Sequence, residues 1–95
     1  MRSDLARGIQ AAQIVHAAGE SSPGNLPCGT HAVVLAVPGE AELEATATRL
    51  TQAGIRFVRI EEPDAPHNGA LMAIGVVPGR KEVLKRAMSS LPLLK

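Results

Sequence analysis

Apolar residues recur at helical spacing in the first part of the chain. Residues 8–19 are rich in alanine, and a glycine closes this run at Gly19, which favours a helix ending there. Ala11, Val15 and Ala18 lie on one side of that helix at i, i+4 and i+7. We therefore expect this stripe of small residues to pack against a sheet.

Two further helices are predicted later in the chain. Residues 40–53 place Leu43, Ala47 and Leu50 at helical spacing, with acidic residues in the first turn and Gly54 directly after the last. The third helix is expected over residues 80–91, with an inward face made of Val83, Leu84, Ala87 and Met88.

Three apolar runs read as strands, at residues 31–37, 55–60 and 70–77. The first two are joined through a helix, which favours a parallel, right-handed crossover. The connection 61–69 is too short for a helical crossover, so the last two are expected to be antiparallel if they are adjacent. The order predicts one domain over residues 1–95, a three-layer α/β/α sandwich with a small mixed sheet. Because the first helix has no strand before it, we expect the natural protein to carry a further strand before Arg2.

Composition places the chain among ordinary globular domains. Hydrophobic residues make up 45% and charged residues 20%, with Phe57 the only aromatic residue. Cys28 has no partner for an intramolecular disulfide, the N-terminus has no apolar signal segment, and no run is long enough to span a membrane. These features predict a cytoplasmic protein with no membrane association.

The charges of the whole chain nearly cancel, but acidic and basic residues are distributed unevenly along the sequence. The net charge of +1 gives no strong electrostatic footprint for nucleic acid. Acidic residues crowd the second helix, and basic residues crowd the C-terminal part at Arg80, Lys81, Lys85, Arg86 and Lys95. A solvated helix face is the favoured interpretation of both clusters, and a binding patch is the alternative.

The candidate chemistry lies in two places. The polar loop 61–69 follows a buried strand and carries Glu61, Glu62, Asp64, His67 and Asn68, in which a carboxylate beside a histidine suits acid–base work. Gln13 and His16 lie on one side of the first helix, and we expect them to face a cleft shared with this loop. The alternative interpretation of the loop 61–69 is a hydrated turn whose charges serve solubility. The histidines and Cys28 lie on separate elements, so we predict no metal and no cofactor.

Several short motifs resemble the opening of the peptidyl-tRNA hydrolase 2 family. Arg2-Ser3-Asp4-Leu5, Ala11-Ala12-Gln13 and His16-Ala17-Ala18 are similar to the family's R-[SN]-D-L, which follows a strand, and to its helix G-K-x-A-A-Q-x-x-H-A-A. Asn68-Gly69 leading into AIGVVP (73–78) resembles the closing P-G-[ST]-x-T-x-x-x-[IL]-G-P. The resemblance covers nearly the whole chain. It implies a four-stranded mixed sheet in an α/β/α sandwich, often dimeric, and cleavage of the ester joining a peptide to tRNA.

The chain departs from this pattern at polar positions. The lysine of G-K-x-A-A-Q falls on Ile9, and the threonine of the closing motif is assigned to Met72. The family's D-A-G-x-T-Q segment has no counterpart here; Glu61 or Glu62 takes the place of its aspartate, and its threonine is missing. Neither isoleucine nor methionine can donate a hydrogen bond from its side chain. Of this polar set, Gln13 alone is kept.

Three functions follow from this comparison. The first is retained hydrolysis of peptidyl- or aminoacyl-tRNA, with candidate catalytic residues Gln13, His16, Glu62, Asp64 and His67. The second is a non-catalytic binding or regulatory module that uses the same cleft, and the third is a hydrolase of a small non-RNA substrate. Ile9 and Met72 favour loss or alteration of the family chemistry, so whether the chain is an enzyme stays open. Partners implied are tRNA or peptidyl-tRNA, bound weakly, and a second copy in a homodimer.

Overall fold

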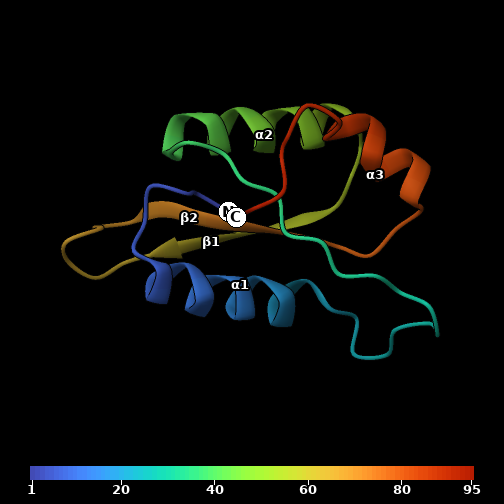
Figure 1. The fold of residues 1–95 in the computed structure, drawn as a ribbon, viewed down its shortest axis with the longest axis horizontal. Helices are drawn as coiled ribbons and strands as arrows, with labels where there is room; N and C mark the ends of the chain where they lie inside the picture. Colours follow the sequence, from blue (N-terminus) through green and yellow to red (C-terminus); the bar gives the residue numbers. More distant parts are fainter.

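A computed structural model describes residues 1–95 as three layers. Helix α1 covers one face of a small sheet and α2 covers the other, with α3 at one end of the molecule on the side of α2 (Figure 1). This arrangement confirms the predicted α/β/α class. The elements in chain order are α1 (Arg7–Ser21), α2 (Glu40–Gln52), β1 (Phe57–Glu62), β2 (Ala70–Val76) and α3 (Lys81–Ala87).

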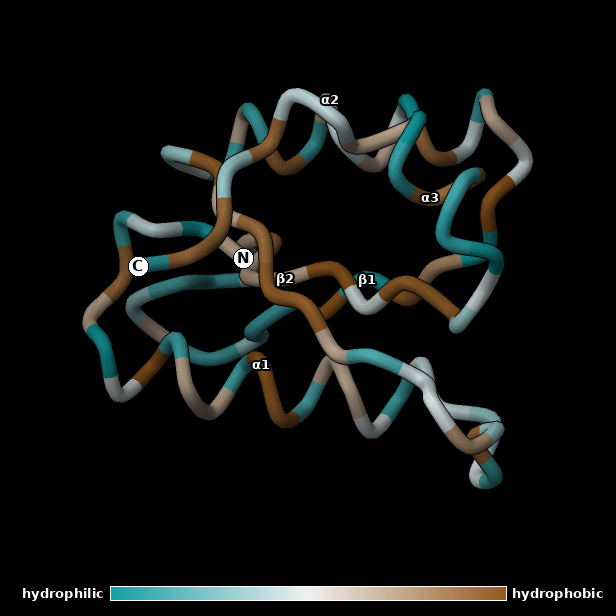
Figure 2. The backbone as a smooth tube through the Cα atoms, turned by 45° about the vertical axis from the view of Figure 1, so that its right-hand side comes forward, coloured by the Kyte–Doolittle hydropathy of each residue, from teal (hydrophilic) through white to brown (hydrophobic).

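The regular sheet consists of β1 and β2, which pair antiparallel as predicted. The register runs from Phe57 opposite Val76 to Glu62 opposite Ala70, with an irregularity between Ile60 and Glu61. β1 extends two residues beyond the predicted strand end, so Glu61 and Glu62 belong to the sheet and not to the loop. The hydrophobic stretch of β2 runs between the helical layers in Figure 2.

The predicted strand 31–37 does not form as a regular strand. Only two isolated bridges remain, a parallel one between Val37 and Arg2 and an antiparallel one between Leu35 and Leu93. The backbone hydrogen bonds of this segment go to residues 1–3 on one side and to residues 92–94 on the other. The parallel component of the sheet is therefore reduced to one bridge. Residues 31–37 do not pair with β1, and the regular strand expected at that end of the crossover is absent.

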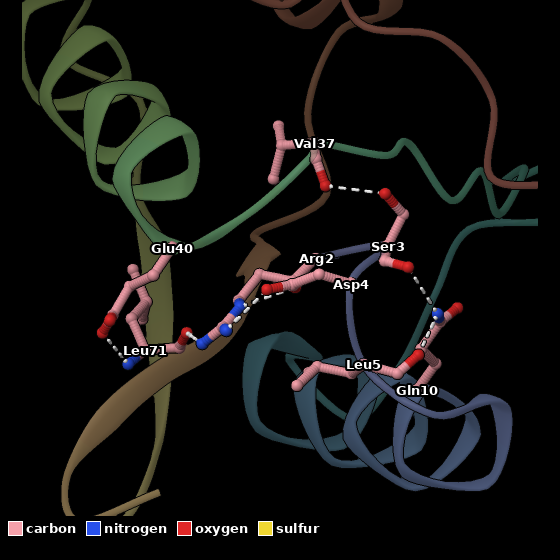
Figure 3. A network of polar contacts seen from close by, with 8 residues as sticks. All are labelled: Arg2, Ser3, Asp4, Leu5, Gln10, Val37, Glu40 and Leu71. Carbon is pink, nitrogen blue, oxygen red and sulfur yellow. Dashed lines mark hydrogen bonds and ion pairs between the residues drawn. The ribbon is translucent and has the colours of Figure 1, made fainter.

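The N-terminal segment lies between residue 37 and β2 (Figure 3). The Ser3 amide and hydroxyl both donate to the Val37 carbonyl oxygen, at 2.8 and 3.1 Å. On the other side, Arg2 Nη1 donates to the Leu71 carbonyl oxygen at 3.1 Å, and the Leu71 amide donates to Glu40 Oε2 at 2.7 Å. Side chains of opposite charge thus satisfy both backbone groups of Leu71, where a neighbouring strand would otherwise pair.

Helix α2 packs with the face that its sequence predicts. Leu43, Ala47 and Leu50 are all buried, and Leu50 has no exposed surface. Leu43 forms a cluster with Val37 and Leu71, which joins the helix to β2. Large aliphatic side chains at helical spacing therefore determine the orientation of this helix.

Helix α1 packs with a different face from the one predicted. Ala11 and Ala18 are exposed and Val15 is 72% exposed, while Ala17 is buried in a cluster with Met1, Ile60 and Ala73. A β-carbon added at Gly75 would overlap the Ala17 carbonyl oxygen and lie 2.9 Å from Ser21 Oγ. The helix therefore approaches β2 closely because Gly75 has no side chain. The face of α1 that packs on the sheet therefore lies on a different side of the helix from the predicted stripe, although both faces repeat with the same helical period.

The helix boundaries also differ from those predicted. α1 continues to Ser21, past Gly19, and α3 ends at Ala87. On α3, Leu84, Ala87 and Met88 are half-buried as an inward face requires, but Val83 is 49% exposed, so its predicted inward position is wrong. None of the helices is long and apolar enough to cross a membrane.

Candidate functional site

An open hollow lies beside the first turns of α1, where the loop after β1 comes back toward the helix. Its volume is about 330 Å³. Its lining combines an apolar part from the helix with a polar part from the end of β1 and the loop that follows: Gly8, Ile9, Ala12, Gln13, Glu62, Asp64, Ala65 and His67.

The helical wall follows from the period of α1. Ile9, Ala12 and Gln13 are spaced i, i+3 and i+4, so they lie on one side of the helix and face the loop together. The Gln10 side chain points elsewhere and donates to the carbonyl oxygens of Leu5, at 2.7 Å, and Ser3, at 3.3 Å (Figure 3). These bonds fix the start of the helix, and with it the position of Ile9.

The loop wall is held by its own backbone. The Asp64 amide donates to Glu62 Oε1 at 3.2 Å, and the amides of His67 and Asn68 both donate to the Asp64 carbonyl oxygen at 3.0 Å. Asn68 and Gly69 adopt positive φ angles of 50° and 90°, which lets the chain turn directly into β2. The carboxylates and the imidazole are therefore presented by a tight turn at the end of the sheet.

The structure brings together four of the five predicted site residues: Gln13, Glu62, Asp64 and His67. The expectation that His16 shares this cleft is wrong. His16 does not line the hollow; its Nε2 lies 3.1 Å from Glu20 Oε1 on the exposed side of α1. The helical period accounts for this, because His16 is nearly one turn further along the helix than Gln13 and away from the loop. Ala12 and Ala65 complete the wall, and no chemical signal in the sequence marks them.

No lysine or arginine lines the hollow. Arg2 is engaged elsewhere, because its guanidinium donates to both oxygens of Asp4 at 3.0 and 2.9 Å. These hydrogen bonds lower the pKa of Asp4. The site thus combines two carboxylates, one imidazole and one amide with an apolar helical wall. No cluster of three His, Cys, Asp or Glu side chains in the structure is arranged to hold a metal ion.

The fold and the hollow define a small α/β/α domain with a polar site at one end of the sheet. The sequence model of the family described as peptidyl-tRNA hydrolase PTH2 matches residues 1–94. The chain belongs to this family. A search of curated proteins finds no match.

The structure locates the two positions at which the chain departs from the family motifs. Ile9, to which the motif resemblance assigns the family's lysine, lines the hollow. Met72 is fully buried in β2 and does not line the hollow, which argues against its assignment to the motif threonine. Counted back from Ile74-Gly75 through T-x-x-x-[IL]-G, the motif resemblance assigns that threonine to Ala70 instead. Ala70 begins β2 and pairs with Glu62 of the hollow.

Proposed function

We propose that this chain is a peptidyl-tRNA hydrolase 2 domain that keeps the family cleft but has lost, or greatly reduced, ester hydrolysis. The observation that carries the proposal is the position of Ile9. It forms part of the wall of a hollow whose charged groups are carboxylates, at the place where the family motif has a lysine.

The chemistry of ester cleavage explains why this exchange matters. Attack of water on the ester carbonyl builds negative charge on its oxygen, and each preorganised donor to that oxygen contributes about 10²–10³ in rate. Ionised Glu62 and Asp64 only accept hydrogen bonds, and Ala70 has no hydroxyl group. The donors left in the hollow are the Gln13 amide and the His67 imidazole.

The clustering of Asp64, His67 and Gln13 supports a second candidate, a hydrolase with replaced chemistry. An imidazole near a carboxylate can take a proton from water, and Gln13 can orient a carbonyl group. Such a site would act on peptidyl-tRNA or on a small non-RNA ester. The cytoplasm, where peptidyl-tRNA arises, is the compartment we propose for either function.

The two candidates differ in a direct assay. Purified protein is incubated with an N-blocked aminoacyl-tRNA, and release of free tRNA is followed beside an active family member. We expect release no faster than the spontaneous rate, and no change on His67→Ala or Gln13→Ala. His31→Ala is the matched control, because His31 is exposed and does not line the hollow. Release that matches the active family member, lost in His67→Ala and kept in His31→Ala, would establish the replaced chemistry instead.

A further inference from the structure

The basic residues gather at the end of the molecule opposite the hollow. Of the ten Lys and Arg residues in the chain, six lie on the last part of α2, directly before β1, or on α3 and its N-cap, and only one of the nine acidic residues, Glu82, accompanies them. In Figure 1 these elements form the end away from the loop between β1 and β2. We call this surface the basic end; its residues are Arg49, Arg56, Arg80, Lys81, Lys85 and Arg86.

Contacts between distant segments build this surface. Arg49 Nη1 donates to Ser90 Oγ at 3.4 Å, which ties the end of α2 to the chain after α3. The Val77 amide donates to the Arg56 carbonyl oxygen at 3.0 Å, so the start of β1 lies beside the segment that leads into α3. Ala53 and Arg86 line one shallow hollow between α2 and α3. The charges therefore come from three elements held side by side.

These cations are available to a ligand. The only ion pair among them is Arg80 with Glu82, at 4.0 Å and with both side chains more than 70% exposed. The other ion pairs of the structure use Arg2, His16 and Arg59, outside the basic end. All six basic residues are exposed. A surface of this kind attracts a polyanion, although the net charge of the whole chain is nearly balanced and does not indicate the surface.

We propose that the basic end binds the phosphate backbone of RNA, with α3 as its centre. The choice of RNA rests on the proposed function, because the family cleft at the other end of the molecule is built for a tRNA ester. The longest extent of the protein is 38 Å, so one structured RNA can reach both ends. Contact is to phosphates and not to stacked bases, because Phe57 is the only aromatic residue and is half-buried.

The same observations disfavour a membrane as the partner. A helix that lies on a lipid surface needs an apolar face directed outward. Leu84 of α3 and Met88 directly after it are half-buried, and Val83 is the one exposed large apolar residue of the helix. The outward positions carry Lys81, Lys85 and Arg86.

The test measures binding of a deacylated tRNA acceptor hairpin by fluorescence anisotropy at several salt concentrations. Because this RNA carries no ester, the result does not depend on whether the cleft is catalytic. We compare Lys81→Gln/Lys85→Gln with Arg7→Gln/Lys95→Gln, which removes the same net charge away from the basic end. Circular dichroism of each variant reports its fold. Poly-glutamate and anionic phospholipid vesicles serve as competitors.

We expect the α3 variant to raise the Kd about tenfold at low salt and to reduce the slope of log Kd against log salt by about 2, roughly one for each lysine. The control variant should change the Kd less than threefold. Equal losses in both variants would overturn the proposal, because net charge alone would then explain binding. Absence of salt-dependent binding by the wild type, or competition by poly-glutamate or vesicles as effective as that by RNA of equal charge, would also overturn it.

Discussion

The two long helices cover opposite faces of the same sheet but are anchored in different ways. α2 inserts Leu43 and Leu50, which are fully or almost fully buried, whereas the one buried residue of α1 is the small Ala17. α2 is held by apolar volume, and α1 by close approach to a glycine of β2. Because of this difference, much of the surface of α1 does not pack into the core, and the hollow is formed beside this unpacked surface.

The largest expected effect on stability comes from removing side-chain volume at the buried face of α2. Leu50→Ala creates a cavity at a position with no exposed surface, and we expect a loss of about 2–5 kcal/mol in the free energy of unfolding. Val15→Ala on α1 is the matched change, and it should alter stability by less than about 0.5 kcal/mol because Val15 is 72% exposed. Urea denaturation measures both. A larger loss for Val15→Ala than for Leu50→Ala would restore the helix orientation that the sequence predicted.

The next effect concerns the close approach of α1 to the sheet. Gly75→Ala places a β-carbon against the Ala17 carbonyl oxygen, so the helix must shift, and we expect a loss on the order of 1–3 kcal/mol. Gly19→Ala is the control on α1 itself, because nothing lies within 4 Å of its added β-carbon. That change should stabilise by roughly 0.5–1 kcal/mol through helix propensity. A neutral Gly75→Ala in thermal unfolding would show that α1 is not held by this contact.

The smallest expected effect concerns an ion pair between α2 and the sheet, which adds to the contribution of the buried apolar side chains. Arg59 of β1 donates to both oxygens of Glu44, at 2.9 and 2.7 Å, and lowers the pKa of that carboxyl below its ordinary 4.5. A carboxyl with a lowered folded pKa contributes stability above its unfolded pKa, and this is lost as pH falls through the folded value. Glu44→Gln should therefore flatten the fall in Tm below pH 4.5. Glu42→Gln, which removes a carboxylate without an ion pair, should leave the fall unchanged.

The elements whose apolar side chains are large could be predicted from the sequence. α2 and the antiparallel pair of β1 and β2 were predictable because leucine spacing and a short polar connection leave few alternatives. The face of α1 was not, because alanines occupy several of its sides and the decisive residue, Gly75, lies more than fifty positions later in the chain. The segment 31–37 has strand composition, but its two bridges go to Arg2 and Leu93, which are distant in the sequence and carry no signal for this pairing.

The site was predictable in its polar part. Glu62, Asp64 and His67 follow a strand and Gln13 belongs to a helical motif, and the structure joins them in one hollow. His16 could not be separated from Gln13 by spacing alone, since the loop reaches only the first turns of α1. The sequence does not reveal that Met72 is fully buried in β2, and this burial disfavours Met72 as a site position.

The most direct test of the account restores the missing groups in the cleft. Ile9→Lys combined with Ala70→Thr is assayed for release of tRNA from an N-blocked aminoacyl-tRNA, beside the wild type and beside Val15→Lys/Ala70→Thr. The control adds the same charge to an exposed position of α1 outside the hollow. We predict a silent wild type, a silent control and at least about 10²-fold acceleration in the restored variant. Hydrolysis by the wild type that equals an active family member and is unchanged or reduced by Ile9→Lys would contradict the account.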